Sequence, residues 1–273
     1  MKVLGKRPDG YHEIESLMQA IDLYDEIGLE KSDMIELACD DPGLAVDDSN
    51  LAVKAALTLQ ERFYFPGVRI DLKKYIPCGA GLGGGSSDAA FVLRGLCRLF
   101  GFTPTLKELS RIASEIGSDV PFFLGGGQAR VTGRGEIVEK VSLPVDYMVV
   151  LVVPSFSIST AEVYGDVKFN LTKVAEPIFL KKRINVSRFK DLVSRFGNDL
   201  ERVVFDKFPE LSEFKTALSD AGAIHSAMTG SGSALFGIFV EGKIDRSEIS
   251  RRIMSRARVI ECKPTVLPIF GAG

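Results

Sequence analysis

The sequence predicts an α+β fold, and three features of one stretch predict it. Val68, Ile70 and Leu72 alternate with charged residues, which is the pattern of a half-buried strand. Between residues 89 and 100, apolar side chains recur at three and four residues, as on one face of a helix. Five glycines stand between these segments, within Gly79–Gly85. The order is therefore strand, glycine loop, helix.

Length and composition bound the architecture. The chain has 273 residues and is 45% hydrophobic, enough to bury one large core or two moderate ones. The net charge is −2 with acids and bases interspersed, so no basic stripe indicates a nucleic-acid partner. The longest apolar run, residues 148–154, is too short to span a membrane.

The first residues and the cysteines point the same way. Charged residues interrupt the N-terminus at once, so we expect no signal peptide. The four cysteines, Cys39, Cys78, Cys97 and Cys262, lack CxxC spacing, and only two histidines are present. A zinc site is therefore not expected, and reduced thiols fit better. We expect a soluble cytoplasmic protein.

The glycine loop has the chemistry of an anion site. Glycines allow positive φ and let a ligand approach the main chain closely. A helix start adds unpaired N–H groups and about half a positive charge. We expect Ser86 or Ser87 to cap the helix, Asp88 to favour its first turn, and Gly101 to end it. Together these features predict a phosphate site.

Three different roles for the glycines fit the sequence less well. A plain flexible turn needs only one or two glycines. The P-loop pattern requires Lys where Ser86 stands. Gly79, Gly81 and Gly84 satisfy the dinucleotide spacing, but that motif needs a second strand ending in an acidic residue. The next segment instead predicts a helix, with Thr105 and Glu108 as a capping box.

The loop resembles the second motif of the GHMP kinase superfamily, Pro-x-x-x-Gly-Leu-Gly-Ser-Ser-Ser-Ala. Its Gly-Gly-Gly-Ser-Ser ending is most similar to the 4-diphosphocytidyl-2-C-methyl-D-erythritol kinases, a family of the non-mevalonate isoprenoid pathway. The resemblance implies ATP binding by Pro77, Cys78, Gly79, Ala80, Gly81, Leu82, Gly83, Gly84, Gly85, Ser86 and Ser87.

The N-terminal stretch GKRPDGYHE carries a turn signal. Pro8-Asp9-Gly10 combines a fixed φ with a glycine, and a strand through Ile14 follows. By itself this is equally well a hairpin tip with an incidental aromatic residue. The resemblance implies a cytidine pocket, in which Tyr11 packs on the cytosine ring and His12 hydrogen-bonds its edge.

Strands and a capped helix follow. Between residues 17 and 38, Ile27, Leu29, Ile35 and Leu37 alternate as in strands. Residues 47–50, Asp-Asp-Ser-Asn, predict the cap of a helix that runs to about Phe63. The start of this helix also matches the kinase family, where it flanks the nucleotide site.

Asp119 stands among Val120, Pro121 and two phenylalanines. A carboxylate in apolar surroundings must be paired or functional. Asp119 could simply cap the helix that begins at Pro121. The resemblance of the Gly-Ser-Asp-Val-Pro-Phe-Phe segment to the kinase family implies that Asp119 is the catalytic base for the substrate hydroxyl.

The second half of the chain continues the alternation of strands and helices. Residues 128–133 and 136–141 predict a hairpin, and residues 147–153 a buried strand. We place a domain boundary near Pro144, giving domains 1–144 and 145–273. A helix starts at Ser159; Tyr164 on it would ordinarily be core, but the resemblance implies that it closes the cytosine sandwich.

Helices and a second glycine turn complete the chain. Residues 184–221 are expected to be mostly helical, with Phe189, Leu192, Val193 and Phe196 on one face. Residues 226–237 predict strand, turn and strand around Gly230, Ser231 and Gly232, and a hairpin explains them locally. The resemblance implies the superfamily's third glycine motif, at the substrate. Arg251, Arg252 and Arg256 form a solvated face, and a last strand starts at Val259.

The resemblance covers nearly the whole chain and implies a two-domain GHMP kinase. The N-terminal domain would be ribosomal protein S5 domain 2-like and the C-terminal domain ferredoxin-like. The implied reaction moves the γ-phosphoryl group of ATP, with Mg²⁺, to the 2-hydroxyl of a small cytidine diphosphate-linked substrate. No metal ligands are assigned. Two alternatives stay open: a kinase for another small alcohol, such as mevalonate or homoserine, or a silent ligand-binding relative.

One family feature has no counterpart. In the kinases the GKRxDGYHE segment follows a strand reading Ala-x-Ala-Lys-Ile-Asn-Leu, whose Lys assists the counterpart of Asp119. Counting back from Gly5 passes Met1 before that Lys is reached, and Lys2 is out of register. We expect either that Met1 is not the natural start or that this chain is a weak kinase.

Overall fold

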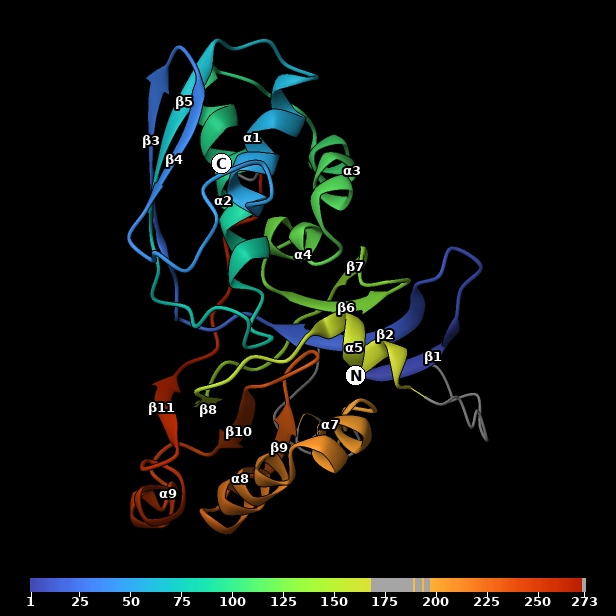
Figure 1. The fold of residues 1–273 in the computed structure, drawn as a ribbon, viewed down its shortest axis with the longest axis vertical. Coiled ribbons are helices and arrows are strands. Elements are labelled where there is room, and N and C mark those ends of the chain that lie inside the picture. The colour runs from blue at the N-terminus through green and yellow to red at the C-terminus, as the bar shows by residue number, and fades with distance from the viewer. Residues whose placement is uncertain (168–188, 190–192, 194–196, 272–273) are drawn as a thin grey trace.

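Three β-sheets organise the part of the chain that the computed structural model describes, residues 1–167, 189, 193 and 197–271 (Figure 1). Their strand orders are β3-β5-β4, β1-β2-β6-β7 and β11-β8-β10-β9. The first two sheets and their helices form an N-terminal lobe, and the third sheet forms a C-terminal lobe below it. Mixed strands and helices in two lobes confirm the predicted two-domain α+β fold.

The first sheet contains β3 (Glu26–Ser32), β4 (Ile35–Cys39) and β5 (Gly67–Lys73). Strand β5 pairs antiparallel with β3 and parallel with β4. Its apolar residues are buried and its charged residues exposed, which confirms the predicted half-buried strand. Helices α1 (Leu51–Gln60) and α2 (Gly84–Phe100) cover one face of this sheet, and α3 (Leu106–Ile116) packs against these two helices. They share one apolar core with the strands.

Helix ends of this lobe follow the local signals. The Asn50 side chain accepts a hydrogen bond from Ala52 N and caps α1, which ends at Gln60 rather than near Phe63. Thr105 and Glu108 form the predicted capping box of α3. Gly101 ends α2 with φ of 74°, in the left-handed region where glycine is favoured.

The second sheet consists of two hairpins. Strands β1 (Lys2–Lys6) and β2 (His12–Gln19) meet at the predicted turn, where Gly10 has φ of 87°. Strands β6 (Gln128–Thr132) and β7 (Ile137–Lys140) form the predicted second hairpin, and β2 pairs with β6. The short helix α4 (Val120–Leu124) leads into β6. This sheet lies between the first sheet and the C-terminal lobe.

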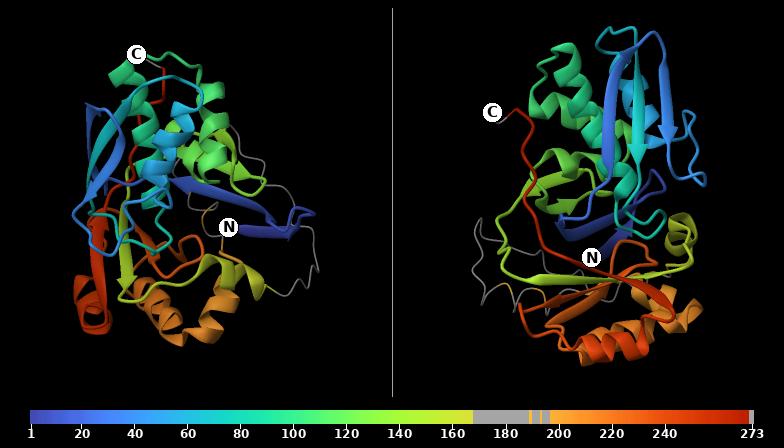
Figure 2. Two further views of the ribbon diagram at one scale, coloured as in Figure 1. Left: turned by 45° about the horizontal axis from the view of Figure 1, so that its top comes forward. Right: turned by 90° about the vertical axis from the view of Figure 1, so that its left-hand side faces the viewer.

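The third sheet is antiparallel and holds β8 (Met148–Pro154), β9 (His225–Met228), β10 (Leu235–Phe239) and β11 (Ala257–Cys262). Helices α7 (Glu201–Lys207), α8 (Pro209–Asp220) and α9 (Arg246–Arg252) cover one of its faces (Figure 2). Helix α5 (Thr160–Gly165) follows β8, with the Ser159 side chain as its cap. Helices on one face of an antiparallel sheet are typical of α+β domains.

The predicted helical stretch 184–221 is confirmed where it is described, in α7 and α8. Phe189 and Val193 are buried, whereas Leu192 and Phe196 lie outside the described residues. On the arginine face, Arg251 is 70% exposed and pairs with Glu248.

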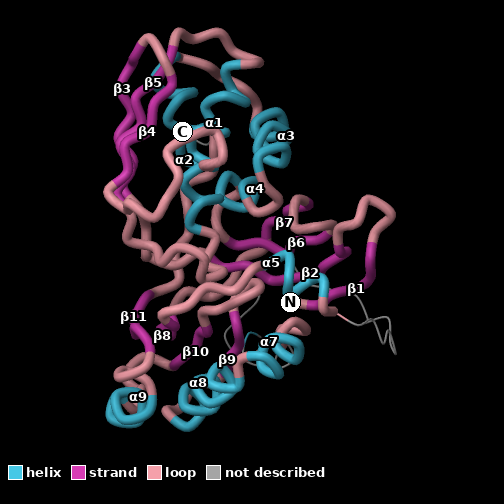
Figure 3. Tube along the Cα trace, viewed as in Figure 1, coloured by secondary structure: helices cyan, strands magenta, loops and turns pink. Residues whose placement is uncertain are grey.

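The C-terminal segment returns to the first lobe after β11, as the trace in Figure 3 shows. Thr265 N donates to Ala20 O at 2.8 Å, and Leu267 N donates to Gly126 O at 3.0 Å. The Arg94 guanidinium on α2 also donates to Pro268 O.

The predicted domain boundary near Pro144 stays a prediction. In the described residues no helix is both long and apolar enough to cross a membrane.

His225 on β9 gives this fold a test by pH. Burial, with smaller effects of Lys215 and the amino terminus, lowers the pKa of His225 from 6.5 to about 4. Below pH 6.5 the unfolded chain therefore binds a proton that the folded chain does not bind until about pH 4. As the pH decreases from 6.5 to about 4, the contribution of His225 to the free energy of unfolding should therefore fall. In urea titrations between pH 6.5 and 4, His225→Gln should therefore lose less stability on acidification than the wild type, and parallel curves for the two proteins would contradict the burial of His225.

Candidate active site

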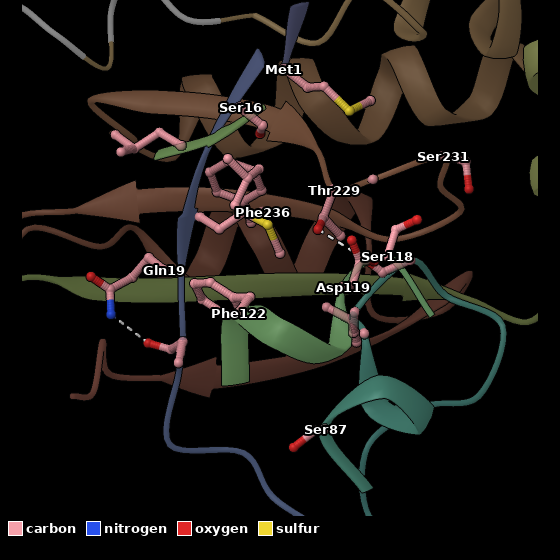
Figure 4. A pocket seen from close by; sticks show the side chains of 18 of the residues that line it. Met1, Ser16, Gln19, Ser87, Ser118, Asp119, Phe122, Thr229, Ser231 and Phe236 are labelled. Carbon is pink, nitrogen blue, oxygen red and sulfur yellow. Dashed lines mark hydrogen bonds between the residues drawn. The ribbon is translucent and has the colours of Figure 1, made fainter. Parts of the chain in front are cut away.

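A cavity of about 1480 Å³ lies between the lobes. Ten of the predicted site residues line it: Tyr11, His12, Gly81, Leu82, Gly83, Ser87, Asp119, Tyr164, Gly230 and Ser231. Figure 4 shows Ser87, Asp119, Thr229 and Ser231 around one space (Figure 4). The remaining predicted residues, Pro77, Cys78, Gly79, Ala80, Gly84, Gly85, Ser86 and Gly232, are not among its described lining residues.

The glycine loop approaches the second glycine turn backbone to backbone. Gly81 has φ of 73°, and a Cβ atom built on it would lie 2.5 Å from Thr229 O. The Thr229 hydroxyl donates to Gly81 O at 3.0 Å, and Ala234 N donates to Ala80 O at 3.1 Å. The close approach therefore requires glycine at position 81.

Helix α2 begins differently from the prediction. Its N-cap is Gly83, with φ of 72°, and no side chain caps this end. Ser86 and Ser87 lie inside the first turn, so the predicted serine cap is wrong. The reason is the left-handed conformation of Gly83, which starts the helix before either serine is reached. An uncapped helix start beside a cavity presents N–H groups and a positive dipole end to an anion.

Asp88 also differs from the prediction. It lies beyond the first turn of α2, and its carboxylate pairs with the Lys74 ammonium at 2.7 Å instead of favouring the helix start. Lys74 pairs as well with Asp25. Burial raises the pKa of Asp88 to about 6, although the ion pair with Lys74 opposes this shift.

Asp119 occupies the N-cap position of α4, but its side chain makes no capping hydrogen bond. A purely capping role for this residue is therefore not supported. Burial raises the pKa of the Asp119 carboxyl. A Cβ atom built on Gly135 would lie 3.3 Å from its Oδ1, so the β6–β7 turn covers one side of the carboxylate. The other surroundings of Asp119 include the cavity itself.

Aromatic rings gather at the β1–β2 end of the cavity. The His12 and Tyr164 rings stack with centroids 5.0 Å apart and planes inclined by 25°. Tyr11 is 53% exposed, and the Arg134 guanidinium lies 4.9 Å from its ring centroid. In the structure the ring that stacks on Tyr164 is therefore His12, whereas Tyr11 contacts Arg134 and keeps about half of its surface exposed.

The sequence did not identify Arg134 as a site residue, because the Gly-Arg-Gly segment that contains it predicts only a turn. Among the described residues that line the cavity, Lys6 is the one lysine and Arg134 is the one arginine. The Arg134 guanidinium also donates to Ser114 O at 3.2 Å, which holds it beside Tyr11. A cation at this place favours a ligand with negative charge.

The second glycine turn is braced from the C-terminal lobe. The Asn198 amide donates to Met228 O at 2.9 Å and to Gly230 O at 2.7 Å. The Ser231 hydroxyl lies 2.7 Å from the Thr160 hydroxyl on α5. The turn therefore joins α5, β9 and the glycine loop at one wall of the cavity.

Comparisons with known proteins identify the family of this chain. Residues 50–127 match the family model of the GHMP kinases N terminal domain, and residues 179–257 match that of the GHMP kinases C terminal. A 4-diphosphocytidyl-2-C-methyl-D-erythritol kinase from Bacillus cytotoxicus is 41% identical over 87% of this chain and 83% of its own. One from Bacillus cereus is 42% identical over the same shares.

Solved structures give the same result. The crystal structure of a 4-(cytidine 5'-diphospho)-2C-methyl-D-erythritol kinase has a TM-score of 0.75 and 33% identity, covering 96% of this chain and 94% of that one. A homoserine kinase from Cytophaga hutchinsonii has a TM-score of 0.69 at 20% identity, covering 93% and 95%, and so shares the fold. With its cavity, its glycine loops and these relatives, the chain belongs to the 4-diphosphocytidyl-2-C-methyl-D-erythritol kinase family of the GHMP kinases.

Proposed function

We propose that this kinase transfers the γ-phosphoryl group of ATP to the 2-hydroxyl of 4-diphosphocytidyl-2-C-methyl-D-erythritol, the compound in the names of its relatives. One observation carries the proposal. The Asp119 carboxylate, with a raised pKa and no capping bond, lines the same cavity as an uncapped helix start and an aromatic cluster. A proton acceptor thus lines one cavity together with groups that suit an anion and groups that suit a ring.

The start of α2 suits the phosphates of ATP. Backbone N–H groups of the loop and first turn, together with the helix dipole, favour negative charge without reorganising during the reaction. The Gly81 contact with the Thr229 loop excludes larger side chains from this wall. Phosphoryl transfer requires mainly positioning and electrostatic stabilisation, which such a rigid wall supplies.

Asp119 would act as the general base. It accepts the proton of the 2-hydroxyl through a carboxylate oxygen, while the hydroxyl oxygen forms a bond to the γ-phosphorus. The bond from that phosphorus to the β,γ-bridging oxygen breaks, and ADP leaves. The raised pKa makes the carboxylate a stronger proton acceptor than an exposed aspartate.

The cytidine end would lie at the β1–β2 hairpin. Tyr11 and Tyr164 offer aromatic faces for the cytosine ring, and His12 offers a polar edge. Arg134, beside Tyr11, would meet the negative charge of the diphosphate. Closing Tyr164 onto cytosine requires the His12 ring to leave its present stack.

The donors in the cavity are compatible with Mg²⁺. The described residues hold no cluster of three acidic, histidine or cysteine side chains around one point. Mg²⁺ seldom requires such a cage, because it keeps waters and binds substrate phosphates with one or two protein groups. The Ser87 hydroxyl, in the first turn of α2, would be such a group. When bound, Mg²⁺ neutralises phosphate charge.

The base assignment is tested by Asp119→Asn, which keeps size and polarity and removes the proton acceptor. We expect kcat to fall by about 10²–10⁴-fold, with the affinity for the ATP analogue AMP-PNP unchanged. Asp71→Asn is a matched control, since Asp71 is exposed and pairs with Arg69 on β5. Near-full activity of Asp119→Asn would show that Asp119 is not the base.

The raised pKa of Asp119 has its own consequence. A base must be deprotonated, so kcat/KM should decline as the pH falls, and a raised pKa moves this decline upward. The apparent pKa of the acidic limb should exceed the ordinary aspartate value of 3.8. Rates measured from neutral pH downward, with circular dichroism at each pH to verify folding, test this. A limb at or below the ordinary value would contradict the role of Asp119.

The aromatic residues are tested by Tyr11→Ala and Tyr164→Ala. Each stacking contact is worth roughly 1–3 kcal/mol, so each variant should bind CDP about tenfold or more weakly. Calorimetric titration with CDP and, separately, with AMP-PNP measures this. AMP-PNP affinity should stay constant, and Tyr64→Ala, at a tyrosine 90% exposed, should change neither. Equal loss for both ligands would indicate damaged folding and contradict a cytosine site.

A further inference from the structure

A buried cluster of three charged side chains lies beside the two ends of the glycine loop, which we call the phosphate loop from here on (residues 77–83). Asp25 precedes β3, Lys74 follows β5, and Asp88 is on α2 (Figure 1). Their side chains are 1%, 6% and 5% exposed, so all three are almost fully removed from solvent. The Lys74 ammonium pairs with both carboxylates and lies 2.7 Å from Asp88 Oδ2. We call these residues the loop clamp.

The loop clamp holds the backbone at the start of the loop. Asp25 Oδ1 accepts hydrogen bonds from Tyr75 N at 2.6 Å and from Ile76 N at 2.9 Å. These two residues lead directly into Pro77 and the glycines. The carboxylate of Asp25 therefore holds the chain where β5 becomes the loop.

The loop clamp also holds the far end of the loop. Asp88 is one turn into α2, and its ion pair ties that helix to Lys74. A Cβ atom built on Gly84, the first residue of α2, would lie 3.5 Å from Lys74 Nζ and 3.0 Å from Ile76 Cγ2. The first residue of α2 therefore packs directly against Lys74 and Ile76, which precede the loop. Residues 77–83 thus connect two segments that the loop clamp holds in place.

Neither stability nor charge explains this cluster well. A buried ion cluster commonly contributes little net stability compared with apolar side chains of the same size, because desolvation offsets the attraction. Although burial lowers the pKa of Lys74, hydrogen bonds with Asp25 and Asp88 raise it overall, so the ammonium stays charged. Two carboxylates and one ammonium beside an anion site make that site less attractive to phosphate, if they act by charge alone.

We propose that Asp25, Lys74 and Asp88 act as positioning residues that fix the phosphate loop in its ATP-binding conformation. A loop with three glycines, Gly79, Gly81 and Gly83, directly followed by two more at the start of α2, loses much conformational freedom when a ligand orders it. Anchoring both ends removes part of that freedom before ATP arrives, and preorganisation of this kind increases affinity. This inference rests on the proposed function, since it assigns ATP to this loop.

The decisive variant is Asp88→Ala. It releases the helix end of the loop and leaves Lys74 and Asp25 as a charge-balanced buried pair, so the fold should persist. It also removes a negative charge near the phosphates. Positioning predicts weaker AMP-PNP binding, by about tenfold, whereas a purely electrostatic role predicts tighter binding. Asp88→Asn keeps an acceptor for Lys74 and should recover most of the affinity.

The control is Lys73→Met, one residue before Lys74. Lys73 is 63% exposed and pairs with Glu26 at 3.4 Å on the surface, so this variant should bind like the wild type. Calorimetric titration of each protein with AMP-PNP and with CDP, after its thermal unfolding is recorded, gives the two affinities. Weaker AMP-PNP binding by Asp88→Ala with unchanged CDP binding supports the loop clamp.

Three outcomes count against the loop clamp or the function beneath it. Unchanged or tighter AMP-PNP binding by Asp88→Ala would mean that the cluster does not position the loop. Equal weakening of AMP-PNP and CDP would mean general damage rather than positioning. If the wild type binds neither AMP-PNP nor CDP, the proposed function itself fails. If the wild type binds both ligands and Asp88→Ala binds them equally well, only the loop clamp fails.

Discussion

Two glycine-rich loops from different lobes touch at their backbones, and the shape of the cavity depends on this contact. Gly81 lies against the carbonyl groups of Thr229 and Gly232, so close that a Cβ atom would meet them at 2.5 and 2.8 Å. The Thr229 hydroxyl adds a hydrogen bond to Gly81 O. Since one loop starts α2 and the other joins β9 to β10, the contact sets the glycine-loop wall of the cavity against the C-terminal lobe.

Charge is divided along the cavity in a way that suits a reaction between two anionic ligands. The start of α2, which no side chain caps, brings positive charge to the cavity wall, and Arg134, which also lines the cavity, is positive beside Tyr11. Asp119 lines the same cavity, with a carboxyl whose pKa burial raises. In the proposed function, a carboxyl that ionises less readily repels phosphate less, and it accepts a proton more strongly once it is ionised.

The sequence by itself determined the features that depend on near neighbours. The alternation in β5, the Asn50 cap, the Thr105–Glu108 box and the turn at Gly10 all follow from residues within a few positions of one another. The sequence also revealed that the glycine loop and the N-terminal segment resemble those of the kinase family. The family comparisons confirmed it.

Only the tertiary structure decided which distant groups meet. Asp88 pairs with Lys74 rather than with its own helix start, and Arg134 lies over Tyr11. Tyr164 stacks on His12 from the other lobe, and the last segment returns to the first. Even the start of α2 depended on the left-handed turn at Gly83, which Phe123 packs against. Local patterns cannot encode these choices, because each depends on chain folding that brings residues far apart in sequence within contact distance.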